Sequence, residues 1–238
     1  TIAALSFISV LCIAFSVGWW PLEPLTAFLV QSTLALIVIS GLAFRARLYA
    51  AGTVVSAIAL IGLIQIVPFA RHEHIPDNYS SCRYSVNIGH ANLFSHGFSI
   101  KRLSTWAAKK NIEILALTEL PDDAANIEQA FSQYPYVLAG GQHGRRKTAI
   151  FSKFPIETIH TDSDAVLAAI AQIDQEVSLT IVSTHPTIAI SPNNMKSRNK
   201  AISGAFAEAS KYSHAIVVGD FNAAPWSPVL AATSREHG

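Results

Sequence analysis

Three apolar segments of this chain each end in a polar side chain of a type that can do chemistry. ILALT runs into Glu119, IVST runs into His185, and AIVVG runs into Asp220 and then Asn222. Carboxylate and amide oxygens are the hard ligands that Mg²⁺ prefers, and Mg²⁺ is commonly held by one or two carboxylates together with a substrate phosphate. The sequence GDFN, at residues 219–222, therefore indicates a site for a metal ion and a phosphate ester.

Each of these residues also has a purely structural interpretation when taken singly. Asp220 and Asn222 are of types that form tight turns, and Glu119 could cap a following helix. His185 could be a surface imidazole ahead of a proline. The four residues all follow strand-like segments of one domain, and this joint placement favours a functional site over four separate turns and caps.

The elements that must position these residues alternate between strands and helices. The expected strands cover 83–88, 113–118, 148–152, 165–173, 177–184 and 215–219, and the expected helices cover 99–110, 123–133 and 195–212. This order predicts an α/β domain over residues 83–238, a layered sandwich of two sheets flanked by helices. Loops at strand ends commonly carry the chemistry of such folds, so polar residues that end strands have the most weight.

The first 70 residues differ in composition from the rest. Glu23, Arg45 and Arg47 are their only Asp, Glu, Lys or Arg residues, and 50% of the whole chain is hydrophobic. The uncharged stretches cover residues 1–22, 24–44 and 48–70. Each has about the 20 residues that a helix needs to cross about 30 Å of hydrocarbon. Three transmembrane helices are expected, since a buried core helix or a signal peptide would explain only one stretch.

The short loops between these helices predict an orientation. The loop with Arg45 and Arg47 carries the positive charge, whereas the loop with Glu23 has two tryptophans and no basic residue. Loops rich in Lys and Arg stay in the cytoplasm. Residues 71–82 form a polar linker, and everything after about Arg71 is expected on the extracytoplasmic side of a bacterial inner membrane.

The charge of the remaining chain is balanced. Two of the 17 basic residues and one of the 16 acidic residues lie in the first 70, which leaves 15 of each beyond them. A protein that grips long nucleic acid usually has a basic surface, so no stable nucleic-acid complex is expected. The local exception is GRRK at 144–147, where Arg146 could either meet a substrate phosphate or lie in a solvated loop.

Several motifs together resemble the endonuclease/exonuclease/phosphatase superfamily of metal-dependent phosphodiesterases. SVNIGHAN resembles the opening strand, ALTEL the segment with the metal-binding glutamate, and VVGDFNAAPWSP the GDFN segment, which is the most specific. GRRKTAIFSKFPI and VSTHP also match in family order, although Thr118 replaces the usual glutamine. The preceding apolar stretches are similar to the membrane-anchored bacterial branch of the superfamily.

The resemblance implies roles for individual residues. A divalent cation, Mg²⁺ or alternatively Mn²⁺, would neutralise charge on the phosphoryl oxygens during attack by water. Glu119 and Asn87 would hold the metal, Asp220 and Asn222 would activate and align the water, His185 would contact the phosphate or the leaving oxygen, and Asn92 would touch the substrate.

The expected function is that of a membrane-anchored phosphoesterase acting on a phosphodiester, in nucleic acid or a phospholipid headgroup, or on a phosphomonoester. The alternative is an inactive, membrane-tethered binding module with the same fold. The family ends in a further strand pair and a catalytic Asp-His motif, and the closing residues Glu236 and His237 do not match it. The domain is therefore expected to lack its last strands and to be catalytically incomplete and only marginally stable as given.

Overall fold

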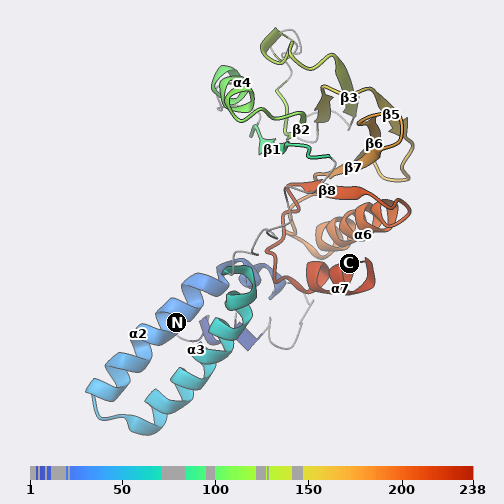
Figure 1. The fold of residues 1–238 in the computed structure, drawn as a ribbon. Helices are drawn as coiled ribbons and strands as arrows, with labels where there is room; N and C mark the ends of the chain where they lie inside the picture. Colours follow the sequence, from blue (N-terminus) through green and yellow to red (C-terminus); the bar gives the residue numbers. More distant parts are fainter. Residues whose placement is uncertain are drawn as a thin grey trace.

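The computed structural model describes residues 4, 6–8, 10–11, 20, 22–70, 84–94, 100–121, 127, 129–140 and 147–237. These residues form a helical hairpin followed by an α/β domain (Figure 1). The predictions made for Arg146, for the linker at 71–82 and for most of the helix at 1–22 lie outside the described residues.

Two helices in the described part of the chain are long and apolar enough to cross a membrane, where the sequence predicted three. The first begins with the 3-10 helix η1 (Glu23–Phe28) and continues as α2 (Leu29–Arg45), and the second is α3 (Tyr49–Ala70). The remaining predicted helix, 1–22, falls mostly among residues that are not described. Glu23 was expected in a connecting loop, but it begins η1 and is buried.

The helical hairpin buries small and polar side chains together with Leu29, Leu36 and Ile58, and exposes many other large apolar ones. The hydroxyls of Ser40 and Ser56 lie 2.6 Å apart, and a Cβ at Gly62 would overlap the side chain of Thr33. The exposed side chains include Leu34, Val38, Leu42, Val54, Leu60 and Ile64. Small and polar residues at the helix contact, with apolar residues around it, are typical of helices that pack together in lipid.

The described α/β domain contains two four-stranded sheets. The first has the order β1 (Ile88–Asn92), β2 (Ile114–Thr118), β4 (Thr148–Ser152) and β3 (Tyr136–Gly140). The second has the order β5 (Ile156–Ile159), β6 (Val166–Gln172), β7 (Ser178–Thr184) and β8 (Ala215–Gly219). The pairs β1–β2 and β7–β8 are parallel, and all other neighbours are antiparallel.

The two sheets pack face to face, and helices cover their outer faces (Figure 1). The core between the sheets contains Ile114, Ile150, Ala169, Ala171 and Ile181. Helix α4 (Ile100–Lys109) packs on the first sheet, and α6 (Pro192–Ala209) packs on the second. Because both of their faces are covered, β2 and β4 are buried along their whole length. The predicted layered α/β sandwich is confirmed.

Most predicted elements match the observed ones closely. Strands β4 and β8 have the predicted bounds. Strands β2 and β7 begin one residue later than predicted, and β6 and α4 are shorter by one residue at each end. Helix α6 begins three residues early because the Ser191 side chain accepts a hydrogen bond from the Asn194 N–H and caps it. Strands β3 and β5 and helix α7 (Pro228–His237) were not predicted. Of the eleven residues in the predicted helix 123–133, five lie outside the described residues.

The first strand lies further along the chain than predicted. It was expected at 83–88, but β1 pairs with β2 from Ile88 to Asn92. Glycine, histidine and asparagine are weak strand formers, so the pattern favoured the preceding residues. The strand forms here because Gly89 has no side chain, and a Cβ on it would lie 3.2 Å from Ile112 and 3.3 Å from Trp106.

Gly219, the last residue of β8, allows β8 and β7 to approach closely just before Asp220. Its φ is +148°, and a Cβ on it would overlap the carbonyl oxygen of its register partner Thr184. Only glycine adopts such a conformation without strain.

We predict that Gly219→Ala lowers the free energy of unfolding by about 2–3 kcal/mol, because the strands must separate to admit the methyl group. The matched control is Gly204→Ala, on the exposed side of α6 with open space around it, which should raise stability by about 0.5–1 kcal/mol. Chemical denaturation in detergent micelles measures both. Equal midpoints for Gly219→Ala and the unmodified chain would contradict the prediction.

Candidate metal and phosphate site

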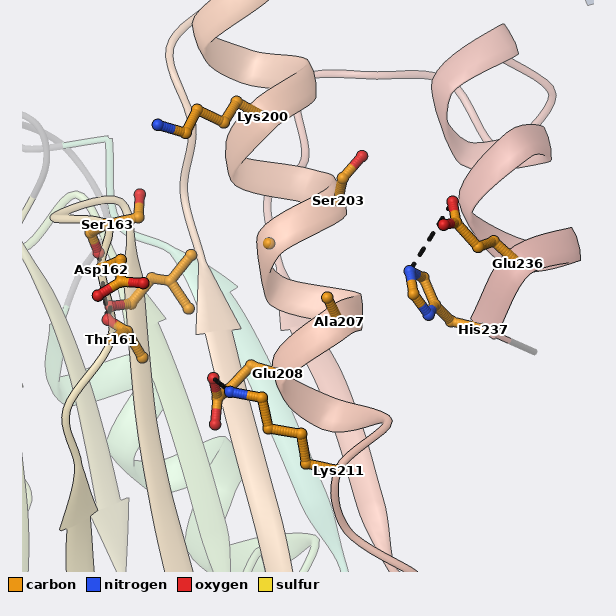
Figure 2. Close-up of a pocket in the computed structure, with 12 residues that line it drawn as sticks. Thr161, Asp162, Ser163, Lys200, Ser203, Ala207, Glu208, Lys211, Glu236 and His237 are labelled. Atoms are coloured by element: carbon orange, nitrogen blue, oxygen red, sulfur yellow. Dashed lines mark hydrogen bonds and ion pairs between the residues drawn. The ribbon is translucent and has the colours of Figure 1, made fainter.

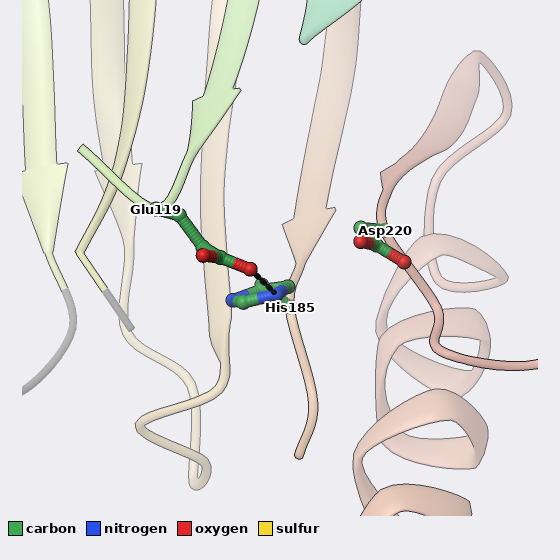
Figure 3. A group of neighbouring side chains, drawn as sticks. All are labelled: Glu119, His185 and Asp220. Atoms are coloured by element: carbon green, nitrogen blue, oxygen red, sulfur yellow. Dashed lines mark ion pairs between the residues drawn. The ribbon is translucent and has the colours of Figure 1, made fainter. Parts of the chain in front are cut away.

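Four strand ends meet at one edge of the sandwich. Asn92 is the last residue of β1, and Glu119, His185 and Asp220 directly follow β2, β7 and β8. Since each parallel pair brings its two carboxyl ends together, the facing sheets place two such pairs side by side. Glu119, His185 and Asp220 point toward one another, and their metal-binding atoms all lie within 4.8 Å of each other (Figure 3).

The amide of Asn92 connects the two acids. Its Nδ2 donates to Glu119 Oε1 and to Asp220 Oδ2, both at 2.9 Å, and its Oδ1 accepts from the Phe94 N–H at 2.8 Å. Ionised carboxylates only accept hydrogen bonds, so the orientation of the amide is fixed by its partners. One side chain of the first sheet thereby ties the acid of its own sheet to the acid of the second.

The structure does not bring Asn87 to this cluster. Asn87 is exposed and precedes the opposite end of β1, where its N–H donates to Glu113 Oε2 at 3.0 Å. The metal role of Asn87 was implied by the resemblance of SVNIGHAN to the family's opening strand, whereas in the structure Asn92, the other asparagine of this motif, lies at the carboxyl end of β1. Aligning β1 with β2 from their carboxyl ends would have selected Asn92, which is paired with Thr118, the residue before Glu119.

His185 has the buried, unpartnered nitrogens expected of a ligand-binding residue. Its exposed fraction is 6%. Nε2 lies 3.3 Å from Glu119 Oε1, but neither ring nitrogen has a hydrogen-bond partner among the described residues. A buried polar atom without a partner is rare in native proteins and calls for an ion, a water or a ligand.

The donor set of the cluster fits a divalent cation. Glu119 and Asp220 are like charges at close range, and such a pair is stabilised when a cation lies between them. Carboxylate oxygens suit Mg²⁺ and Mn²⁺, and an imidazole nitrogen is accepted more readily by the later transition metals. The orphaned nitrogens of His185 are the observation that favours a missing ligand over a closed hydrogen-bond network.

Asn222 locks the loop after β8 to the loop after β7. Its N–H donates to Asp220 Oδ1 at 3.0 Å, and its Nδ2 donates to the carbonyl oxygen of Pro186 at 2.9 Å. Asn222 has a φ of +48° and Glu119 a φ of +52°. Asparagine tolerates this left-handed region, whereas glutamate seldom adopts it, and backbone strain of this kind clusters at functional sites.

Sequence analysis missed His90, which lies two residues before Asn92 on the same strand. Burial lowers the pKa of its imidazole, while the Asp220 carboxylate opposes the shift and His185 adds to it. Burial thus favours the neutral form of the ring. His90 Nε2 lies 3.4 Å from Thr118 Oγ1, and His90 also borders a cavity of about 470 Å³ beside α4. The sequence contained a signal for this placement, because residues two apart on a strand point to the same face and His90 is two residues before Asn92.

His237 lies in a different place. A cavity of about 480 Å³ on the outer side of the second sheet is bordered by α6, residues 161–163 and the end of α7. His237 points into this cavity, with Nε2 3.9 Å from Glu236 Oε2 (Figure 2). No residue of the Glu119 cluster borders it, which agrees with leaving His237 without a catalytic role.

We predict that Asn92→Ala weakens the binding of Mn²⁺ about 10- to 100-fold, because the group that orients both carboxylates is lost. Asn87→Ala, the matched control just before the same strand, should change the dissociation constant less than about twofold. Isothermal titration calorimetry on the purified chain measures both constants. If Asn87→Ala weakened Mn²⁺ binding more than Asn92→Ala did, Asn87 and not Asn92 would be the residue that supports the metal.

Known proteins agree with this fold. The sequence model of the Endonuclease/Exonuclease/phosphatase family matches residues 85–236. The structure is similar to an endonuclease/exonuclease/phosphatase from Beutenbergia cavernae DSM 12333, with a TM-score of 0.52 and 10% identity over 64% of this chain and 54% of that one. It is also similar to beta toxin from Staphylococcus aureus, with a TM-score of 0.51 and 15% identity over 63% and 70% of the two chains.

A third similar structure is an AP endonuclease from Archaeoglobus fulgidus, with a TM-score of 0.50 and 17% identity over 63% of this chain and 69% of that one. At such identities the structural likeness shows the fold alone. No curated protein matches this sequence. The family match over residues 85–236 covers both parallel strand pairs and the residues that follow them, so the chain belongs to the endonuclease/exonuclease/phosphatase family.

Proposed function

We propose that this chain is a membrane-anchored phosphoesterase that uses a divalent metal to hydrolyse a phosphodiester or a phosphomonoester. The observation that carries the proposal is the convergence of Glu119, His185 and Asp220 within 4.8 Å at the strand ends. A phosphodiester in a phospholipid headgroup or in nucleic acid is the preferred substrate. The balanced charge beyond residue 70 favours a transient encounter over a stable nucleic-acid complex.

The proposed roles are those that the family resemblance implies, and the contacts of each residue support them. Glu119 holds the metal, either Mg²⁺ or Mn²⁺, and Asn92 orients its carboxylate. The metal supplies positive charge for the phosphoryl oxygens. Asp220, fixed by hydrogen bonds from Asn92 and Asn222, accepts the proton of the attacking water. His185 donates a hydrogen bond to the phosphate or the leaving oxygen.

Asn222 aligns the water or the phosphate from a backbone that its own side chain anchors to Pro186. Arg146 stays a proposed phosphate contact on the strength of the GRRK sequence alone.

We further propose that the hairpin spans a bacterial inner membrane and that the α/β domain lies outside the cytoplasm. The 22 residues of α3 would be about 33 Å long, close to the thickness of the hydrocarbon core. The turn between α2 and α3, with Arg45 and Arg47, lies at the end of the hairpin farthest from the α/β domain (Figure 1). Basic loops stay in the cytoplasm, so this arrangement supports the opposite side for the domain.

We predict that Glu119→Gln and Asp220→Asn each lower kcat/KM at least about 100-fold in the complete protein, with the fold intact. Hydrolysis of bis(p-nitrophenyl) phosphate with Mg²⁺ or Mn²⁺ measures the rate. Glu157→Gln, an exposed acid on β5, is the matched control and should keep the full rate. Near-normal turnover by either site variant would refute the roles assigned here. A complete protein that binds Mn²⁺ but hydrolyses no phosphoester would favour the inactive binding module.

We also predict that alkaline phosphatase fused after residue 81 is active in a bacterial host and that the same reporter fused at Ala46 is inactive. The reason is that this reporter works only outside the cytoplasm, and the two sites lie on opposite sides in the proposed topology. A cytoplasm-only reporter that is active after residue 81 would reverse the orientation.

A further inference from the structure

The head of the helical hairpin packs directly on the segment that follows the candidate site. The indole Nε1 of Trp226 donates to the carbonyl oxygen of Thr26 in η1 at 2.6 Å. The ring of Phe69, near the end of α3, packs edge-on against the same indole, with ring centres 5.7 Å apart. Since Trp226 is four residues beyond Asn222, the loop after β8 runs from the cluster to the hairpin.

A buried arginine makes a second, charged connection at the same place. Arg198 on α6 is 2% exposed, and it forms a two-pronged ion pair with Glu23, with N–O distances of 2.8 and 3.1 Å. Its Nη1 also donates to the carbonyl oxygen of Asn222 at 3.2 Å. Its Nε and Nη2 donate to Asn199 Oδ1 at 3.1 and 2.8 Å. All five N–H donors of the guanidinium are therefore used.

The buried Glu23–Arg198 ion pair is better suited to fixing the positions of its neighbours than to stabilising the fold. Removing two charges from water costs free energy that their attraction seldom exceeds, so a buried ion pair is weak evidence for stabilisation alone. The planar guanidinium, by contrast, fixes several acceptors in one geometry, which an ammonium cannot do. Glu23 is the only acid in the first 70 residues, and it is placed where it holds this guanidinium.

The contacts continue from Arg198 into the cluster. Asn222, whose carbonyl Arg198 holds, donates its own N–H to Asp220 and its side chain to Pro186, the residue after His185. Two of the three clustered side chains thus stand on a loop pair that Asn222 joins. Displacement of the Asn222 carbonyl would tilt both.

We propose that Arg198 and Glu23 are positioning residues through which the membrane hairpin fixes the Asp220–Asn222 loop in its active geometry. The inference rests on the proposed hydrolytic function of the cluster. The hairpin is then a structural part of the site as well as an anchor, and neither Arg198 nor Glu23 touches the substrate.

The test uses the full chain in detergent or lipid vesicles and two changes at the pair. The double variant Glu23→Gln/Arg198→Gln removes both charges together, so no unpaired charge is left buried and the protein should unfold near the normal temperature. Its kcat should fall about 10- to 100-fold, with KM within about twofold. Arg198→Lys keeps the charge, but its ammonium has three N–H donors, whereas the guanidinium donates five hydrogen bonds. The kcat of Arg198→Lys should therefore be nearly as low as that of the double variant.

Arg235→Gln on α7 is the matched control, because the Nε of this exposed arginine donates to Ala231 of its own helix. It should keep the normal kcat. A purely structural pair would lower the unfolding temperature of the double variant and leave kcat per folded molecule unchanged, and that result would overturn the proposal.

A second readout does not need turnover. Amide hydrogen exchange of residues 219–227 should be faster in the double variant than in the unmodified chain, and Mn²⁺ should bind about 10- to 100-fold more weakly. If the complete protein proves to hydrolyse nothing, these two measurements still decide the inference. Unchanged exchange together with unchanged Mn²⁺ affinity would overturn it.

Discussion

The two carboxylates of Glu119 and Asp220 lie in facing sheets, and a single amide, that of Asn92, holds them together. Like charges at this separation repel, so the rest of the domain must keep them in place. The parallel pairs β1–β2 and β7–β8 bring the strand ends to one edge. Glycine at 219 lets β8 approach β7, and a left-handed backbone at Glu119 turns its side chain toward Asp220. A cation between the acids would relieve the repulsion that this framework imposes.

Much of this framework could be predicted from sequence because uninterrupted apolar runs, such as ILAL before Thr118 and AIVV before Gly219, have a strong local signature. The strands β2, β4, β7 and β8 were predicted within one residue, and Glu119, His185 and Asp220 follow three of them. The end of the apolar run marks the end of the strand, so the polar residue that follows the strand can also be identified from sequence.

Strand β1 was displaced for the opposite reason. Its residues Gly89, His90 and Asn92 have low strand propensity, and only pairing with β2 makes them a strand. The pairing of β1 with β2 brings Asn92, and not Asn87, beside Glu119. Strands β3 and β5 were missed because neither is buried along its length, so their patterns are weak. The ion pair of Glu23 with Arg198 joins residues that are 175 positions apart, and no local pattern contains it.

The hairpin and the α/β domain meet at the loop that follows Asp220 and Asn222. Trp226 contacts Thr26 and Phe69, and Arg198 contacts Glu23 and the Asn222 carbonyl. A simple tether would need none of these contacts. They give a physical reason why the apolar hairpin carries one acid at the end that meets the α/β domain, and they place the candidate site beside this end of the hairpin.

The most direct test of the account is the anomalous scattering of Mn²⁺ in crystals of the complete protein. The account predicts a strong anomalous peak between the carboxylates of Glu119 and Asp220, within bonding distance of at least one of them and close to Asn92. Saturating Mn²⁺ with no peak at this position, or with the ion bound elsewhere in the domain, would contradict it.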